Sequence, residues 1–375
     1  MDSFLRDIVN SFSEPDVPDK KIVDLVTKLA DSGERFKFDS QVFDFASTGG
    51  PSSLTTILVP LYLFAYGVNV INLAVPGRPA GAVDVLGQIP EYKLNYYTNQ
   101  AICKTHFYLH LEADARFAPL DRQLYEYRKA VNKINNPNLA IASLLSKKIV
   151  SGASNIGLDI RVSSFGNFGA TREESVCYAK KYNRIANQFG ITSICFLSNA
   201  AVPYQQYIGR GEALIALYKI LNASEDNYLG EHNKFCIEIA QKMVGEHCSL
   251  TANNAKDAFT QNLLFQGSKY EFFENAVEKV ISQPYRKLFA SRDGFVSYNL
   301  PEIRRYIVCR QKMDEHSSKY PDPSGIVLLQ KQGDYIEKEQ PVLLIRNSLP
   351  LLEKQFSFFE MSESASIYKR NLEVI

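Results

Sequence analysis

The sequence predicts a mixed α/β protein with a small all-helical domain and a large α/β domain. Apolar runs with strand character, such as 42–45 and 156–162, alternate with segments of helical spacing, as in a sheet that carries helices on its faces. Two other segments, 1–36 and 120–150, show apolar residues at helical spacing and no strand-like runs. The expected small domain comprises residues 1–36 and 120–150, and the large domain comprises residues 37–119 and 151–375, with a β-rich C-terminal lobe at about 293–350.

Composition is that of an ordinary globular protein. The chain has 375 residues, of which 45% are hydrophobic and 22% charged, and its net charge is +1. A net charge this small gives no electrostatic basis for binding nucleic acid or an anionic membrane. The most apolar run, residues 57–66, is too short to span a bilayer and contains Pro60, so we expect a buried helix there.

Cysteine and histidine usage argues against a metal site. The six cysteines are scattered and never paired at metal spacing, which favours reduced thiols in the cytoplasm. His106 and His110 are four apart, but they lie in a strand-like run where that spacing does not bring side chains together. The N-terminus lacks the apolar core of a signal peptide. We therefore expect a cytoplasmic protein without a metal and without membrane attachment.

The first third of the chain is expected to alternate between strands and helices. Residues 1–36 carry apolar positions at helical spacing on either side of a turn at 15–19. The elements that follow are a strand at 42–45, a small-residue loop at 46–53, a helix at 54–66, a strand at 68–75, a glycine- and proline-rich turn with a helix, a strand at 107–111 and an acidic loop at 112–116.

Later elements continue this alternation as far as residue 221. They are a strand at 156–162, a helix at 173–189, a strand at 191–197 and a helix at 212–221. Residues 222–290 are helical and charged with alternating signs, so we expect an outer layer without a site. Glycine and aspartate in 325–336 indicate turns, so we expect β-hairpins there.

Residues 125–148 hold the most informative group of polar side chains. Ser143 and Lys147 are four apart and share one face of a helix, and Arg128 precedes a polar connector, 132–137, that can reverse the chain. These three residues supply a planar fork of donors, a hydroxyl and a point charge, which suits a flat heterocycle with carbonyl oxygens and a ring N–H. On the residues alone, a solvated helix end is the commoner explanation.

Tyr125-Glu126-Tyr127-Arg128 and the segment 142–148 (ASLLSKK) resemble the signature of the thymidine phosphorylase and pyrimidine nucleoside phosphorylase family. In that family the matching Tyr, Arg, Ser and Lys contact the pyrimidine base. The resemblance implies a class II nucleoside phosphorylase-like architecture, a pyrimidine nucleoside as substrate, phosphate as co-substrate with no other cofactor, and a homodimer. It assigns base binding to Tyr125, Arg128, Ser143, Lys147 and the aromatic Phe168.

A glycine loop marks a second region of interest. Ser47-Thr48-Gly49-Gly50 lies between an expected strand and helix, where backbone N–H groups can bind an anion, although a plain tight turn explains the same residues. The resemblance favours the anion loop, because these residues match the phosphate loop of the family. The Lys–His pair that precedes that loop is replaced here by Phe45 and Ala46. We therefore expect phosphate to bind weakly.

Four other positions bear on the acceptor. Thr56 could supply a hydroxyl, and Arg78 falls near a family histidine, where it is either a substitute cation or, as we prefer, a surface arginine. Glu112 and Asp114 occupy a loop that is neutral in the family, so either could repel phosphate and act as a base toward water, unless the loop is simply solvated.

The resemblance thus implies a pentosyltransferase that breaks an N-glycosidic bond. Arg128 and Lys147 would stabilise the departing base, and the acceptor would be weakly bound phosphate or water. The alternative is a non-catalytic nucleoside- or nucleotide-binding protein.

Overall fold

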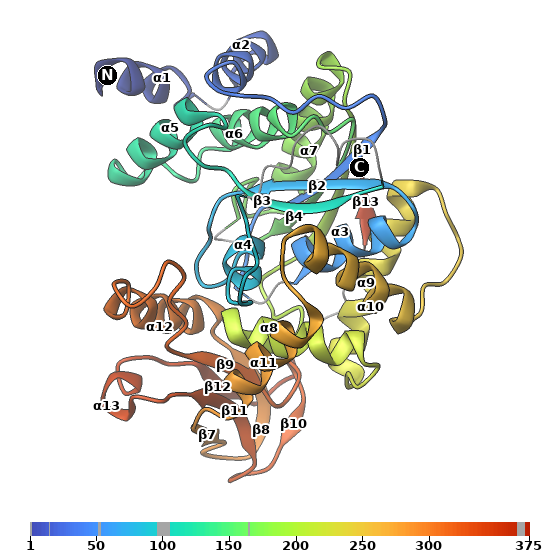
Figure 1. Ribbon diagram of the computed structural model, residues 1–375. Helices are drawn as coiled ribbons and strands as arrows, with labels where there is room; N and C mark the ends of the chain where they lie inside the picture. The colour runs from blue at the N-terminus through green and yellow to red at the C-terminus, as the bar shows by residue number, and fades with distance from the viewer. Residues whose placement is uncertain (1, 15, 52–53, 96–105, 164–165, 366–371) are drawn as a thin grey trace.

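A six-stranded sheet forms the centre of the computed structural model, which describes residues 2–14, 16–51, 54–95, 106–163, 166–365 and 372–375 (Figure 1). The strand order is β13-β5-β4-β1-β2-β3, with β13 antiparallel and the other five parallel. The strands are β1 (Val42–Ser47), β2 (Asn69–Ala74), β3 (Tyr108–Glu112), β4 (Asn155–Val162), β5 (Thr192–Asn199) and β13 (Glu373–Val374). The mixed α/β class predicted from the sequence is confirmed.

One face of the sheet is covered by a helical layer. Its members are α1 (Asp2–Ser11), α2 (Asp19–Ala30), α5 (Pro119–Ala130), α6 (Pro137–Val150) and α7 (Arg172–Gln188). Helix α6 begins at a proline in its first turn and is capped by Asn136, whose side chain accepts a hydrogen bond from the Leu139 N–H at 2.9 Å. Apolar side chains of this layer share one core with Ile156 and Leu158 of β4. The layer is therefore packed directly onto the sheet.

The opposite face carries a second set of helices. They are α3 (Thr55–Ala65), α4 (Ala82–Leu86), α8 (Arg210–Leu221), α9 (Asn227–Val244), α10 (Ala252–Phe265) and α11 (Tyr270–Ile281). Helix α3 contains the most apolar run and is buried along nearly its whole length, which confirms the buried helix expected there. Within the part of the chain that the structure describes, no helix combines the length and apolarity needed to cross a membrane.

The C-terminal part forms a lobe with a core of its own (Figure 1). Its sheets have the orders β10-β8-β12 and β6-β9-β11-β7. The elements are β6 (Tyr207–Ile208), β7 (Tyr285–Phe289), β8 (Gly294–Tyr298), α12 (Leu300–Met313), β9 (Gly325–Leu328), β10 (Tyr335–Ile336), β11 (Pro341–Arg346), α13 (Pro350–Glu353) and β12 (Phe359–Ser362).

Two expectations for this region are wrong. Residues 325–336 do not form a hairpin, because β9 pairs with β6 and β11 whereas β10 pairs with β8 in the other sheet. Gly333 has a φ of +84° and marks a turn, but a turn does not determine which strand becomes the partner. Residues 222–290 are not helical throughout, since β7 occupies their last part.

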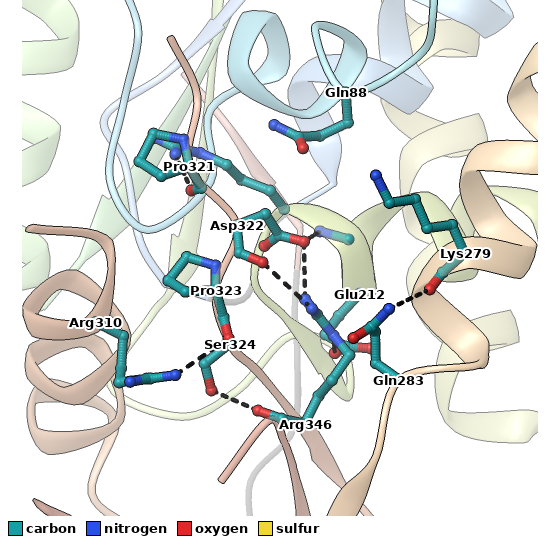
Figure 2. A network of polar contacts seen from close by, with 12 residues as sticks. Gln88, Glu212, Lys279, Gln283, Arg310, Pro321, Asp322, Pro323, Ser324 and Arg346 are labelled. Carbon is teal, nitrogen blue, oxygen red and sulfur yellow. Dashed lines mark hydrogen bonds and ion pairs between the residues drawn. The ribbon is translucent and has the colours of Figure 1, made fainter. Parts of the chain in front are cut away.

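A buried ionic network joins the lobe to α8 (Figure 2). Arg346 of β11 contacts Glu212 of α8 at 2.7 Å and Asp322 at 2.8 Å. The backbone N–H of Gly211 donates to the same Asp322 carboxylate at 3.1 Å. We call residues 319–324 the strap, because this segment lies between the lobe and the central body. The ion pairs are almost fully buried, so the strap fixes the lobe in place.

His110 makes stability depend on pH. It is fully buried on β3, with Nε2 2.7 Å from the Tyr108 hydroxyl, and burial lowers its pKa to about 3. Between pH 6.5 and 3 the unfolded chain therefore binds a proton that the folded protein does not, so stability falls as pH falls. We expect His110 to account for about 2 kcal/mol of the stability lost between pH 7 and pH 5.

Urea unfolding of His110→Leu at both pH values tests this. The variant should lose less stability on acidification than the wild type by that amount. His106→Leu removes an exposed histidine four residues earlier in the chain. It is the matched control and should keep the wild-type difference in stability between the two pH values. An unchanged difference in His110→Leu would contradict the assignment.

Candidate functional site

A cavity of about 220 Å³ opens at the carboxyl ends of β1 and β2, where ligands bind in open α/β sheets. Two layers of the fold contribute to its wall. The sheet side supplies Phe45–Ser47, Gly49, Gly50, Thr56, Asn72–Val75, Gly77–Ala82 and Arg161, and the helical layer supplies Leu144, Lys147 and Lys148. Of the predicted site residues, Ser47, Gly49, Gly50, Thr56, Arg78 and Lys147 are thus brought together.

Lys147 is held in place by neighbouring side chains of the helical layer. Its ammonium nitrogen lies 2.7 Å from Asp121 Oδ2 of α5, and it donates to Ser143 Oγ at 2.8 Å and to the Ser143 carbonyl. The helical spacing of Ser143 and Lys147 therefore brings them into contact, as predicted. Asp121 was not predicted as a site residue. It lies in the first turn of α5, and only the folded arrangement of α5 and α6 reveals it as the partner of Lys147.

The other residues predicted to bind the base do not line the cavity. Arg128 is buried, and its guanidinium donates to the carbonyls of Lys133 and Ile134 in the connector between α5 and α6. Burial lowers the pKa of Arg128. Tyr125 is partly exposed on α5, and Phe168 is buried in the core shared by the helical layer and the sheet. Their roles in base binding stay predictions.

The glycine loop is a turn whose polar groups are used internally. The Thr48 N–H donates to the Asp159 carbonyl at 2.9 Å, and the Gly49 N–H donates to Ser47 Oγ at 3.0 Å. Gly49 and Gly50 have φ values of +100° and +135°, which L-residues rarely adopt. A Cβ atom at Gly50 would lie 2.7 Å from Nη1 of Arg161. The predicted loop also includes 52–53, which lie outside the described residues.

Arg161 supports this loop from β4. Its guanidinium pairs with Asp159 at 2.8 Å and donates to the Gly49 carbonyl at 3.0 Å and to Thr55 Oγ1 at 2.8 Å. It also stacks on the ring of Tyr204, 4.7 Å from the ring centre. Arg161 was not predicted as a site residue. Arg161 lies two residues after Asp159, on the same side of a buried strand, and carries the opposite charge. This pattern in the sequence could have indicated a buried ion pair.

A buried ion pair connects the helical layer to the sheet beside the cavity. Lys148 Nζ lies 2.7 Å from Asp44 Oδ2, and the two side chains are 3% and 0% exposed. Asn72 Nδ2 donates to Asp44 Oδ1 at 2.9 Å. Burial raises the pKa of Asp44, and the charge of Lys148 opposes that rise. Asp44 is a lone carboxylate in an apolar strand, which was the sequence signal for a buried cationic partner.

Arg78 lies in a loop whose backbone is fixed. The N–H groups of Gly77 and Gly81 donate to the Asp84 carboxylate at 2.8 and 2.9 Å. The Arg78 guanidinium is 3.7 Å from Glu315, and these side chains are 33% and 49% exposed. Arg78 thus lines the cavity with a partly exposed charge that is only loosely paired.

The two carboxylates predicted as bases lie outside the cavity lining. Glu112 ends β3, so it belongs to the strand and not to the loop that was expected to begin there. It accepts a hydrogen bond from the Tyr320 hydroxyl at 2.6 Å and pairs with Lys319. Asp114 pairs with Arg116 at 2.8 Å. A catalytic role for either carboxylate stays a prediction.

Comparison with known proteins gives relatives of one kind along most of the chain. Proteins named pyrimidine-nucleoside phosphorylase match from Staphylococcus epidermidis (24% identity, 89% of this chain and 81% of that protein), Geobacillus stearothermophilus (22%, 90% and 86%) and Staphylococcus haemolyticus (26%, 89% and 81%). The chain is thus similar over most of its length to proteins named pyrimidine-nucleoside phosphorylase. The family resemblance predicted from the sequence is therefore confirmed. No protein-family model matches the chain.

Solved structures were compared as well. An anthranilate phosphoribosyltransferase from Thermus thermophilus aligns with a TM-score of 0.49 and 14% identity, over 74% of this chain and 93% of that one. The corresponding enzyme from Saccharomyces cerevisiae aligns with a TM-score of 0.43 and 12% identity, over 70% and 80%.

Proposed function

We propose that this protein is a pentosyltransferase-type enzyme that cleaves the N-glycosidic bond of a pyrimidine nucleoside. One observation carries the proposal: a single cavity is lined by Lys147 on the helical side and by Ser47, Gly49 and Gly50 of the glycine loop on the sheet side. A departing pyrimidine gains negative charge, and a cation that contacts it stabilises the transition state more than the ground state. The names of the distant relatives support a pyrimidine nucleoside as the substrate.

Binding of the pyrimidine base requires only that Lys147 and Arg128 exchange some of their present hydrogen-bond acceptors. Lys147 donates to Ser143 through two neutral acceptors, and a pyrimidine carbonyl can replace either of them. Arg128 likewise donates to two neutral backbone carbonyls, so its part in base binding requires exchanging one of them for the base. Exchange between neutral acceptors costs little, because each hydrogen bond contributes about 1 kcal/mol net.

The acceptor side is the part that we propose to be altered. Phe45 and Ala46 line the cavity directly before the glycine loop, and both are uncharged. The acceptor is accordingly weakly bound phosphate or water. Glu112 or Asp114 would have to leave its present partner to act on water.

A product assay tests the proposal. Uridine, thymidine, deoxyuridine and cytidine are incubated separately with the protein, and free base is measured by chromatography. Release of base from at least one nucleoside is the expected result. If no nucleoside releases base and none binds in calorimetry, the site assignment is wrong.

A non-catalytic nucleoside-binding protein is the second candidate. It is favoured by the internal contacts of Arg128, which hold the connector between α5 and α6. Calorimetric binding of a nucleoside without any release of base is the result that would select it.

A further inference from the structure

We propose that the acceptor half of the cavity takes water, so that the protein hydrolyses its nucleoside and does not use phosphate. This inference rests on the function proposed above and specifies the acceptor. It follows from how the polar groups around the acceptor half are already engaged.

The first support is the hydrogen bonding of the glycine loop. A loop that binds a phosphate dianion must direct unengaged N–H groups at it. Here the N–H groups of Thr48 and Gly49 have acceptors within the protein, namely the Asp159 carbonyl and Ser47 Oγ. Thr48 Oγ1 is also engaged, since it accepts from the Arg161 N–H at 2.9 Å. The loop therefore has the shape of an anion loop but has used several of its polar groups internally.

The second support is the pairing of the cations. Four cationic side chains are found among the described residues that line the cavity. Three of them have a carboxylate partner within 2.8 Å, in the pairs Lys147–Asp121, Lys148–Asp44 and Arg161–Asp159, and all six side chains are 10% exposed or less. Each pair is close to neutral as a unit, so none supplies the net positive charge that a dianion needs. The Lys147 ammonium can still donate a hydrogen bond to a departing base, which develops less charge than a phosphate dianion carries. Moving an uncompensated dianion out of water is strongly unfavourable.

Arg78 is the exception, and it is insufficient for a dianion. Its pair with Glu315 at 3.7 Å is solvent-exposed, a geometry that typically contributes between about 0 and 1 kcal/mol. One exposed cation faces a wall that is otherwise largely apolar near the loop, with Phe45, Ala46 and Ala82 among its members. A neutral nucleophile has no charge to compensate, and water fits this environment.

The reaction is balanced without any further reactant. The oxygen of water bonds to C1′ of the pentose while the bond from C1′ to the pyrimidine nitrogen breaks. The electron pair of that bond stays on the pyrimidine, next to Lys147. One proton of the water reaches the pyrimidine nitrogen by way of solvent, and the products are free pentose and free base.

The test identifies the sugar product. The nucleosides are incubated in phosphate-free buffer and in the same buffer with inorganic phosphate, and the sugar is identified as free pentose or as pentose 1-phosphate. We expect equal rates of base release in both buffers, with free pentose as the product. Release that needs phosphate and yields pentose 1-phosphate would overturn the inference and leave the proposed function intact. Absence of base in both buffers would instead reject the proposed function.

A binding measurement gives an answer that does not depend on activity. We expect calorimetry with inorganic phosphate to detect no binding to the wild-type protein at millimolar concentration. Ala46→Lys places a cation at the cavity wall and should raise phosphate affinity by about tenfold or more, whereas Ala46→Met, of similar length without charge, should not. Tight phosphate binding by the wild type would overturn the inference even if the lysine variant fails to fold.

Discussion

Lys147→Met is expected to lower the rate of base release by about a hundredfold or more, the effect typical of removing one donor that stabilises developing negative charge. Among the residues predicted to bind the base, Lys147 is the one that lines the cavity within the described ranges. Its loss removes the ammonium group proposed to contact the departing pyrimidine, because the neighbouring Lys148 is held by Asp44. The measurement is the steady-state rate of base release from the nucleoside that the wild type cleaves fastest.

The control for this prediction separates catalysis from stability. Lys181 is also a buried lysine, but it donates to the Val17 carbonyl at 2.6 Å and to Asn138 at 3.0 Å, and it does not line the cavity. Lys181→Met should therefore lower stability while the folded fraction keeps its activity. Because Lys147→Met leaves Asp121 without its cation, Lys147→Met/Asp121→Asn is measured beside it. Full turnover in either Lys147 variant would refute the role assigned to Lys147.

The second large effect concerns the free energy of unfolding. Lys148→Met leaves the buried Asp44 carboxylate without its cation, and breaking such a pair typically costs about 3–5 kcal/mol. That is a large part of the total stability of a typical domain, about 5–15 kcal/mol. Urea unfolding monitored by circular dichroism measures the loss. The double variant Lys148→Met/Asp44→Asn should recover a substantial part of it, because no charge remains buried.

An exposed pair provides the comparison. Lys129 and Glu126 are 3.7 Å apart on α5, and both side chains are largely exposed. Lys129→Met should change the free energy of unfolding by no more than about 1 kcal/mol. If Lys148→Met costs no more than Lys129→Met, the pair with Asp44 does not lie in a dry interior.

The alternation of strands and helices was predictable because its signals are local. Residues 42–45 form part of β1 as expected, and α6 starts at the proline that follows the polar connector. The pairing of β9 and β10 was not predictable, because the same turn signals suit a hairpin and a crossing between two sheets. The division of the chain into two domains stays a prediction, although the helical layer shares its core with β4 and β5.

The sequence indicated the glycine loop and two of the cations that line the cavity, Lys147 and Arg78, but not the carboxylates that pair with the lining cations Lys147, Lys148 and Arg161. Ser143 and Lys147 follow from helical spacing, and the glycine loop follows from its composition. The carboxylates of Asp44, Asp121 and Asp159 determine the charge of the cavity. Asp44 and Asp121 lie on elements other than those of the cations they pair with. Similarly, Glu112 looked like an available base until the strap supplied Tyr320 and Lys319 as its partners.

The strap also limits which motions can admit a substrate. Arg210 of α8 contacts Asp84 at 3.4 Å and donates to the Pro321 carbonyl, and Gln311 of α12 donates to the Pro79 carbonyl at 2.6 Å. These contacts make the lobe, the strap and the cavity wall at 77–81 a single mechanical unit. After the lobe, β13 pairs with β5 at the edge of the central sheet. The lobe is therefore not free to move independently of the cavity wall at 77–81, and a movement of α6 against the sheet would have to break the buried pair between Lys148 and Asp44.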